Sequence, residues 1–423
     1  MTYPKDVVDE RGNVHVLNAQ PLGEGGQGVV FATKNPDLAV KLLSSGIQQD
    51  SEKKQPLLDR LTKGFGADLQ QGNDAHQRLR GRLETVRTLP LPDLHLAQPL
   101  DMLRGHIGYT MRLLRDMVPI RTLILPPGSE NAAAEYLASG GLRRRLRVLA
   151  KTAQTLGRLH AIPLVYADVS PNNVFISSKL DATEVWLIDA DNLHYQSTPG
   201  PSVYTPGFGA PEVVGGHAAV STLSDVYAFA VLSFYVIAQT HPFLGSQVEE
   251  GGWEASVDLE EQAYAGALPW IEDEEDDANW SDKGIPRDLV LTPRLRRLFQ
   301  QTFGFGRQNA TLRPSMLEWA EALHQSCDLT VKCRACGSTF YVPQRNCPWC
   351  ADSPSAELLY VEFRAWDPEL DADAYDAVLA SPPQWRMCLD LEEEGSIRRH
   401  AAEPSLLRDD DPPFIKVQPK RRS

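Results

Sequence analysis

Polar and apolar positions alternate along residues 14–43 in the manner of β-strands. Three such runs, at 14–17, 23–31 and 38–43, are punctuated by glycines and by an Asn-Pro-Asp turn signal at 35–37. The pattern predicts a three-stranded meander near the N-terminus.

A helix is predicted next, over about 76–89, where Pro90 and Pro92 end it. From about residue 130 the pattern becomes helical. Between Leu142 and Leu159 apolar residues recur three and four positions apart, which predicts one apolar helix face. A sheet-rich part followed by a helical part, reaching to about residue 326, predicts an α+β chain with two lobes and a cleft between them.

Charge and hydropathy narrow the function classes. The chain has 42 Lys and Arg against 56 Asp and Glu, a net charge of −14, which argues against a general nucleic-acid binder. Its longest uncharged apolar run, residues 226–238, is too short to span a bilayer and predicts a buried helix. The first residues also lack the features of a secretion signal, so we expect a cytoplasmic protein without a membrane partner.

The glycine-rich run fits G-x-G-x-x-G-x-V, with Gly23, Gly25, Gly28 and Val30 at the fixed positions. Glycines let the backbone approach phosphates closely and present its N–H groups. Dinucleotide-binding folds share the spacing but need a helix directly afterwards, whereas a strand-like run continues here. Lys41, on the next run, is placed to hold ATP phosphates.

Two further segments carry acidic groups. Asp168 is followed by Asn173, the arrangement of a phosphoryl-transfer loop in which the carboxylate accepts a proton and the amide binds Mg²⁺. Ordinary Asx turns are the competing interpretation. That interpretation does not account for Asp189, which an apolar run at 185–188 delivers to where a carboxylate would meet the same cation.

Further pieces follow in order: Met111 as a candidate for the adenine pocket, the 209–212 segment Gly-Ala-Pro-Glu, Asp225 at the start of the apolar helix, and Arg313 as a partner for Glu212. With these, residues 14–326 resemble a bacterial eukaryotic-like serine/threonine protein kinase. The resemblance implies a kinase domain over 1–326, with a small β-rich lobe at about 1–113, a helical lobe at about 114–326, and ATP with Mg²⁺ between them.

The resemblance also assigns roles. Asp168 would be the catalytic base, Asn173 and Asp189 the Mg²⁺ ligands, and Glu84 the acid that positions Lys41. The implied nucleotide site comprises Gly23, Gly25, Gly28, Val30, Ala39, Lys41, Glu84 and Met111. Thr205 matches the hydroxyl typical of serine/threonine-directed kinases, and the candidate phosphorylation sites are Thr205, Thr198, Ser197 and Ser202.

The chain departs from the kinase pattern in three places. Ala167 replaces the arginine before the catalytic aspartate, Ser170 replaces the catalytic-loop lysine, and residues 190–191 are Ala-Asp instead of Phe-Gly. Loss of the lysine predicts slow turnover, because one cation near the transferring phosphoryl group is missing. Two alternatives remain: a nucleotide-binding pseudokinase scaffold, and a small-molecule kinase of the aminoglycoside type, against which the 209–212 segment, Asp225 and Arg313 argue.

Four cysteines form two C-x-x-C pairs over residues 327–356: Cys333, Cys336, Cys347 and Cys350. Two such knuckles give a tetrahedral site of four thiolates, which predicts structural zinc in a zinc ribbon. Iron is one alternative, and paired disulfides, which a reducing cytoplasm disfavours, are the other. We expect the ribbon to act as a docking element for a protein partner. A tail with short strands follows over 357–423.

The kinase-plus-ribbon layout is similar to bacterial kinases associated with tellurite-resistance and stress systems. That likeness implies a protein substrate and, as partners, a von Willebrand A-type domain protein and a metal-dependent protein phosphatase. One basic cluster, residues 143–147, is interpreted as a solvated helix face.

Overall fold

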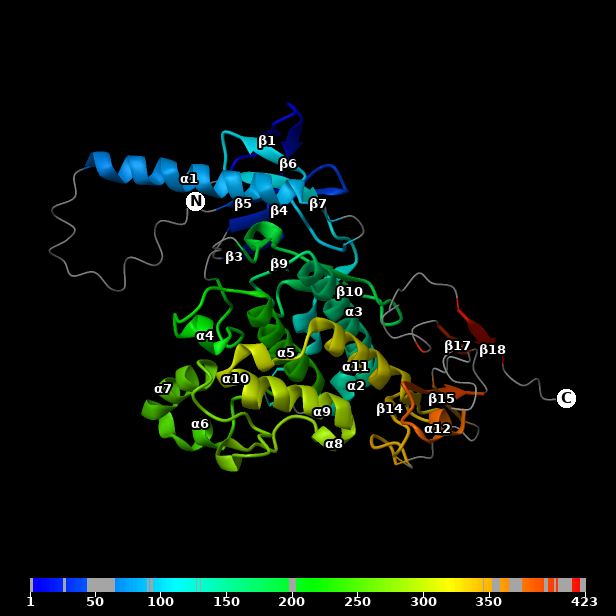
Figure 1. Cartoon of the computed structure of the whole chain (residues 1–423). Helices are drawn as coiled ribbons and strands as arrows, with labels where there is room; N and C mark the ends of the chain where they lie inside the picture. Colours follow the sequence, from blue (N-terminus) through cyan, green and yellow to red (C-terminus); the bar gives the residue numbers. More distant parts are fainter. Residues whose placement is uncertain are drawn as a thin grey trace. The chain divides into compact units, whose positions relative to one another are not determined.

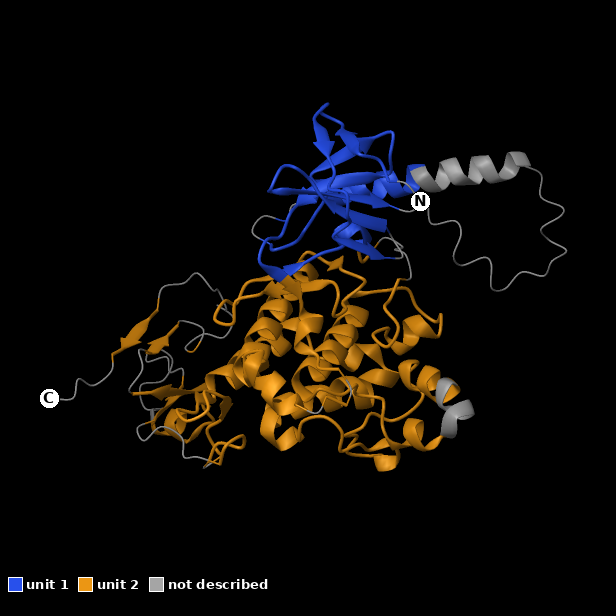
Figure 2. Ribbon diagram, turned by 180° about the vertical axis from the view of Figure 1, so that it is seen from behind, with its two compact units in different colours: residues 1–117, 186–194 blue, residues 118–185, 195–423 orange. Residues whose placement is uncertain are grey.

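The computed structural model describes residues 3–25, 28–43, 65–89, 91, 94–126, 128–129, 131–197, 203–344, 346–351, 358–364, 375–391, 395–398, 401 and 413–418. The chain divides into two compact units (Figure 2). The first unit joins residues 1–117 to residues 186–194, and the second joins residues 118–185 to residues 195–423.

The first unit is built on a seven-stranded sheet with the order β2-β1-β6-β7-β5-β4-β3 (Figure 1). Its strands are β1 (Asp6–Asp9), β2 (Val14–Val16), β3 (Gly23–Gly25), β4 (Gly28–Ala32), β5 (Leu38–Leu43), β6 (Asp101–Arg104) and β7 (Gly108–Arg112). The predicted meander is confirmed for β3, β4 and β5, which pair antiparallel in sequence order. The first predicted run differs: β2 pairs with β1, a strand that the hydrophobic pattern did not indicate.

The long helix α1 (Phe65–Thr88) also belongs to the first unit. The prediction located its C-terminal half and its end but missed its start. Leu83 of α1 is fully buried and packs with Met102 and Tyr109 of the sheet. The helix is therefore fixed to the sheet through its C-terminal half.

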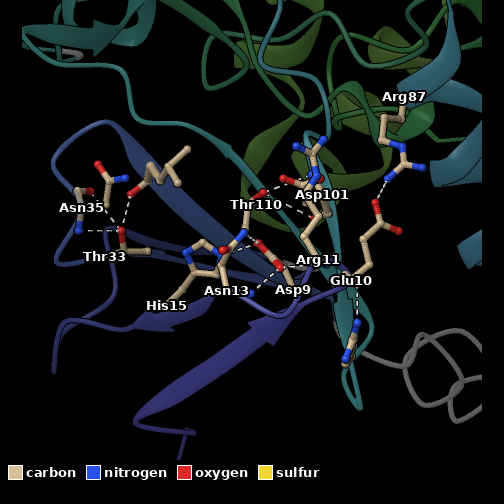
Figure 3. Close-up of polar contacts among 12 residues, drawn as sticks. Asp9, Glu10, Arg11, Asn13, His15, Thr33, Asn35, Arg87, Asp101 and Thr110 are labelled. Atoms are coloured by element: carbon tan, nitrogen blue, oxygen red, sulfur yellow. Dashed lines mark hydrogen bonds and ion pairs between the residues drawn. The ribbon is translucent and has the colours of Figure 1, made fainter.

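A buried polar cluster closes the β1–β2 hairpin (Figure 3). The Asp9 carboxylate accepts hydrogen bonds from the backbone N–H groups of Arg11 and Asn13 and lies 2.9 Å from His15 Nε2. Burial raises the pKa of Asp9, but the hydrogen bonds from His15 and Asn13 outweigh this effect and hold it at about 2. The hairpin is thus fixed by an ionised carboxylate that compensates otherwise unpaired turn amides.

The second unit is mainly helical (Figure 1). Its helix α5 (Thr222–Ala238) is buried along almost its whole length. A capping box between Ser221 and Ser224 starts α5. Aromatic rings pack beside it, including Phe229 against Trp319 at 5.9 Å between centroids. The other helices of eight or more residues are α3 (Gly141–Ala161), α7 (Gly252–Tyr264), α9 (Pro293–Gln300) and α11 (Met316–Asp328).

Shorter elements complete the described chain. The short helices are η2 (Ile120–Leu123), α2 (Ala132–Ala138), η3 (Ala190–Asn192), α4 (Pro211–Val214), α6 (Ser246–Glu250), η4 (Asp277–Asn279), α8 (Arg287–Val290), η5 (Gln301–Phe305), α10 (Gly306–Gln308), η6 (Ala310–Leu312) and α12 (Tyr375–Ala380). The remaining strands are β8 (Met117–Pro119), β9 (Leu164–Val165), β10 (Val174–Ser177), β11 (Val185–Leu187), β12 (His194–Tyr195), β13 (Thr330–Lys332), β14 (Thr339–Tyr341), β15 (Leu358–Phe363), β16 (Trp385–Asp390), β17 (Gly395–Ile397) and β18 (Ile415–Val417).

The basic cluster at 143–147 is not the solvated helix face that was predicted. Arg145 is fully buried, and its guanidinium donates to the carbonyls of Leu123 and Val236 at 2.8 and 3.1 Å. Arg143 donates from Nε to Thr330 Oγ1 of β13 at 2.7 Å. These arginines therefore bond the start of α3 to the segments packed against it. A guanidinium carries several N–H donors in a rigid plane, so one side chain can satisfy more than one backbone carbonyl.

Among the residues that the structure describes, no helix combines the length and apolar character needed to cross a bilayer.

Candidate kinase site

Lys41 lies near the middle of β5, opposite Val30 of β4 and Tyr109 of β7. The lysine side chain is only 3 % exposed. Its Nζ lies 2.9 Å from Asp189 Oδ1 and 3.1 Å from each carboxylate oxygen of Asp191. The first unit therefore brings the predicted lysine and the predicted metal-binding aspartate together.

A tight turn aims both aspartates at the lysine. Asp189 has a left-handed backbone, with φ 57°, and the single turn η3 follows it directly. Burial raises the pKa of Asp189, with the charge of Lys41 opposing that rise. Burial in turn lowers the pKa of Lys41, but the two carboxylates outweigh it and raise the pKa overall. The lysine is thus a cation held by two acids.

The prediction that Glu84 positions Lys41 is wrong. Glu84 is half exposed on α1 and forms an ion pair with Arg80, one helical turn earlier, at 3.2 Å. That spacing favours a local surface pair. The buried partner that sequence reasoning missed is Asp191, which appeared only as a departure from the Phe-Gly pattern.

The glycine-rich segment is a hairpin that continues as a strand. Gly23 pairs with Val30 and Gly25 with Gly28, so β4 follows the glycines directly and the dinucleotide-binding alternative is excluded. The tip of this hairpin lies outside the described residues. At Gly28 a Cβ would lie 2.2 Å from the backbone oxygen of Leu42, so only glycine fits beside β5.

The two other residues predicted for the nucleotide site lie on neighbouring strands of the same sheet. Ala39 of β5 pairs with Met111 of β7, two positions along the strand from Lys41. Ala39 is buried, and Met111 is half-buried. The sheet therefore carries Val30, Ala39, Lys41 and Met111 on three adjacent strands.

In the second unit Asp168 is the centre of a hydrogen-bond network. Asn173 Nδ2 donates to Asp168 Oδ2 at 2.7 Å and to the Asp168 carbonyl at 3.0 Å. Thr205 Oγ1 donates to the other carboxylate oxygen at 2.8 Å. Three residues that the sequence selected independently thus meet at one carboxylate.

The loop that carries Asp168 is held by a carboxylate from α5. Asp225, only 1 % exposed, accepts from the backbone N–H groups of Tyr166 and Ala167 at 2.7 and 2.9 Å. Ala167 has φ 78°, a strained conformation for a residue with a side chain. The hydrogen bonds to Asp225 compensate this strain and fix the backbone one residue before Asp168.

Glu212 and Arg313 form the predicted ion pair. Both terminal nitrogens of the fully buried Arg313 side chain donate to the Glu212 carboxylate at 2.7 Å, so the pair is bidentate. A pocket borders Asp168 and Thr205, and its other lining residues are mostly apolar: Ala167, Val169, Val203, Tyr204, Phe208, Gly209, Ala210, Val213, Val220, Ser224 and Ala228. The segment between Thr205 and Glu212 is therefore fixed in place beside the Asp168 carboxylate.

The candidate phosphorylation sites differ in their surroundings. Thr198 and Ser202 lie outside the described residues. Ser197 is exposed, whereas the Thr205 hydroxyl is bonded to Asp168.

The four predicted cysteine ligands meet in the second unit. All four Sγ atoms lie within 4.8 Å of one another, with Cys333 3.6 Å from Cys350 and Cys336 3.7 Å from Cys347. These sulfurs are too far apart for disulfides, in which S–S is about 2.05 Å. Burial raises the pKa of Cys336, but hydrogen bonds from Ser338 outweigh it and lower it to about 6.

Each cysteine pair is shaped by the residue that follows it. Gly337 and Ala351 both have left-handed backbones, with φ 72° and 60°. Their N–H groups donate to the carbonyls of Cys333 and Cys347 at 2.9 and 2.8 Å. The two knuckles therefore have the same turn, which aims two sulfurs of each pair at a common centre.

Comparison with known proteins agrees with this geometry. Residues 139–318 match the family model of the protein kinase domain. Over 247 residues the chain is 25 % identical to the serine/threonine-protein kinase pkn2 of Myxococcus xanthus, covering 55 % of this chain and 25 % of that relative. Over 244 residues it is 26 % identical to PkaB of Streptomyces coelicolor, covering 53 % of this chain and 49 % of the relative.

A shorter stretch of 106 residues is 32 % identical to PknA of Mycobacterium tuberculosis, covering 25 % of this chain and 24 % of the relative. The chain thus spans about a quarter to a half of the length of these curated relatives. Residues 139–318 are therefore similar to a protein kinase domain, and parts of the chain are similar to bacterial serine/threonine kinases.

Proposed function

We propose that the chain is an ATP-dependent serine/threonine protein kinase that transfers the γ-phosphate to protein hydroxyls, its own among them. The observation that carries the proposal is the network at Asp168, where Asn173 and Thr205 occupy both carboxylate oxygens. This carboxylate would accept the proton of the attacking hydroxyl, with Asn173 holding it in place. Magnesium would neutralise phosphate charge, and its ligands would be Asn173 and Asp189.

The other residues of the site would position the ATP phosphates and the substrate. Lys41 would hold the ATP phosphates, and the glycine hairpin would cover them with its backbone N–H groups. The Glu212–Arg313 pair supports a protein substrate over a small molecule, because it fixes the segment on which a peptide would lie next to Asp168. Ser170 leaves the loop without its usual lysine, so we expect slow turnover.

Autophosphorylation with labelled ATP tests this function. Asp168→Asn is expected to lower the rate by about 100- to 10,000-fold, the usual contribution of a general base. Asp189→Ala removes a proposed Mg²⁺ ligand and is expected to abolish incorporation. The exposed Asp181→Asn is the control and should keep the wild-type rate. Incorporation that survives both site variants would refute the assignment, and nucleotide binding without any incorporation would favour the pseudokinase scaffold.

We further propose that the cysteine cluster holds a structural zinc ion. Tetrahedral Zn²⁺ with Zn–S of about 2.3 Å requires sulfurs about 3.8 Å apart, close to the 3.6 and 3.7 Å found here. Four thiolates fill every position, so no site is left for a reactive water. The metal would therefore stabilise the fold.

Elemental analysis tests the metal. We expect about one zinc per chain, lost on combined Cys336→Ser and Cys350→Ser substitution. Cys388→Ser is the control, because Cys388 is a buried cysteine outside the cluster of four. If the analysis finds iron, the cluster is a metal site but not a zinc site. A folded protein that contains no metal would refute the metal site.

For organisation and partners we propose what the resemblance implies. The kinase domain would cover 1–326, the ribbon 327–356 and the tail 357–423, in a cytoplasmic protein of a tellurite-resistance or stress system. Its partners would be a von Willebrand A-type domain protein and a metal-dependent phosphatase, with the ribbon as a docking module. Co-purification of either partner with the full-length chain from its host tests this proposal.

A further inference from the structure

The buried partner of Lys41 is Asp191. Each of its carboxylate oxygens lies 3.1 Å from Lys41 Nζ, and the side chains of both residues are almost fully buried, at 2 % and 3 % exposed. A buried ammonium is costly unless it is paired and hydrogen-bonded. Asp191 supplies two such contacts, so it contributes strongly to keeping Lys41 in place.

Among its described side chains, helix α1 supplies no acid for this purpose. Glu84 is the only acidic residue among its described side chains, 77–88. The positions that face the unit's interior are the buried Leu83 and Val86 and the half-buried Leu79 and Arg82, which share one helix face. Glu84 is two residues from Arg82, about 200° further around the helix. Its carboxylate therefore belongs to the opposite face.

The charged residue on the inward face of α1 is basic, whereas a partner for Lys41 would have to be acidic. Arg82 is half-buried, and the negative charge of Asp191 acts on it and opposes the effect of its burial. Helix α1 and the turn η3, which contains Asp191, lie against each other. Asp191 is thus attracted by two cations, Lys41 from the sheet and Arg82 from the helix.

The two aspartates of the turn differ in access. The Asp189 side chain is 27 % exposed, whereas that of Asp191 is 2 % exposed. An exposed carboxylate is available to a hydrated cation, whereas a buried one bonded to lysine is not. Both carboxylates therefore bond to Lys41, but only that of Asp189 is also exposed enough to accept a cation.

We propose that Asp191 is the positioning residue for Lys41, with Arg82 of α1 as a nearby cation, so that the acid fixing the lysine lies two residues after Asp189 and not on the helix. The inference rests on the proposed kinase function. Without Asp191, Lys41 would keep only Asp189 as its partner. The lysine would then compete with Mg²⁺ for the same carboxylate and would be poorly placed for the phosphates.

The variant Asp191→Asn tests this role in the full-length chain, because it keeps the shape and removes the charge. We expect KM for ATP to rise roughly tenfold or more and the Mg²⁺ concentration for half-maximal rate to rise with it. Arg82→Gln should shift both quantities in the same direction by a smaller factor. Loss of folded protein alone would lower kcat and leave KM and the Mg²⁺ requirement unchanged.

Glu84→Gln is the matched control, since it removes an acid from α1 without touching Lys41. It should keep the wild-type KM and Mg²⁺ requirement. A wild-type KM in both Asp191→Asn and Arg82→Gln, or a Glu84→Gln effect as large as that of Asp191→Asn, would overturn the inference.

A second readout separates the inference from the kinase proposal. Binding of trinitrophenyl-ATP, titrated with Mg²⁺ and followed by fluorescence, needs no turnover. If the wild-type chain binds this probe but transfers no phosphate, the kinase function fails, and weaker binding by Asp191→Asn still supports the positioning role. Unchanged binding by that variant would contradict the role whether or not the chain is active.

Discussion

At the scale of single residues, His241 shows how neighbours dictate a protonation state. Its Nε2 lies 3.0 Å from the Gly207 carbonyl, and its Nδ1 accepts the Phe243 N–H at 3.2 Å. A ring with one donor and one acceptor in these places is neutral. Burial agrees with this geometry, because it lowers the pKa of His241 to about 4. The neutral ring thereby fixes Gly207, which lies between Thr205 and Glu212.

This histidine predicts a pH dependence of stability. An unfolded histidine binds a proton below about pH 6.5, whereas the folded His241 resists it down to about pH 4. The contribution of His241 to the free energy of unfolding is therefore complete above pH 6.5 and is lost as the pH falls toward 4. Over that range the free energy of unfolding changes by up to about 1.4 kcal/mol per pH unit.

Urea unfolding of the wild type and of His241→Gln over pH 4–8 measures this contribution. Glutamine can also donate and accept but does not titrate, so the variant should show the smaller loss of stability between pH 6.5 and 4. Equal slopes for the two proteins would contradict the assignment.

The same scale shows which site residues the sequence can reveal. Asp168 and Asn173 are close in the chain, and the loop geometry that joins them follows from their spacing. Asp191 and Arg82 are far apart in sequence, and no local pattern indicates that they interact. The resemblance assigns Glu84 to Lys41, but the rotation of the helix turns Glu84 to solvent. Side-chain direction was the missing information.

At the scale of elements, local sequence patterns predicted whether a segment is a helix or a strand better than they predicted which strands pair. The runs that became β3, β4 and β5 were recognisable from alternation and turn residues. The pairing of β1 with β2 and with β6 was not, because β1 is four residues long and its partner β6 lies almost a hundred residues later. Such a short strand gains its stability from its neighbours and carries little signal of its own.

The cysteine knuckles are the element that the sequence predicted most completely. A C-x-x-C pair restricts its own turn, so the ligands and their grouping could be derived from spacing. The shared left-handed residue after each pair, Gly337 and Ala351, is visible only in the structure. Glycine adopts that backbone freely, whereas Ala351 must be held there by its hydrogen bond to Cys347.

At the scale of the molecule, the cysteine-bearing segment packs on the helical part of the second unit instead of extending from it as a free module. The Tyr341 hydroxyl donates to the Val290 carbonyl at 3.0 Å, and Arg143 of α3 bonds to Thr330. Trp349, between the last two cysteines, stacks on Tyr136 of α2 with ring centroids 5.4 Å apart. The guanidinium of Arg145 lies 3.8 Å from the same tyrosine ring on its way to the carbonyls of Leu123 and Val236.

This continuity predicts that the cysteine segment stabilises the helical part of its unit. Trp349→Ala removes the stacked ring and should cost about 1–3 kcal/mol, because the side chain is half-buried and the loss is that of a partial cavity. The melting temperature should fall by a few degrees, while the metal content stays unchanged because no ligand is altered. Trp280→Ala is the matched control, since Trp280 is 56 % exposed in the same unit and should shift the melting temperature by less than a degree or two. Equal shifts in the two variants, or a separate melting transition for the cysteine segment, would show that it folds independently of the helices on which it rests.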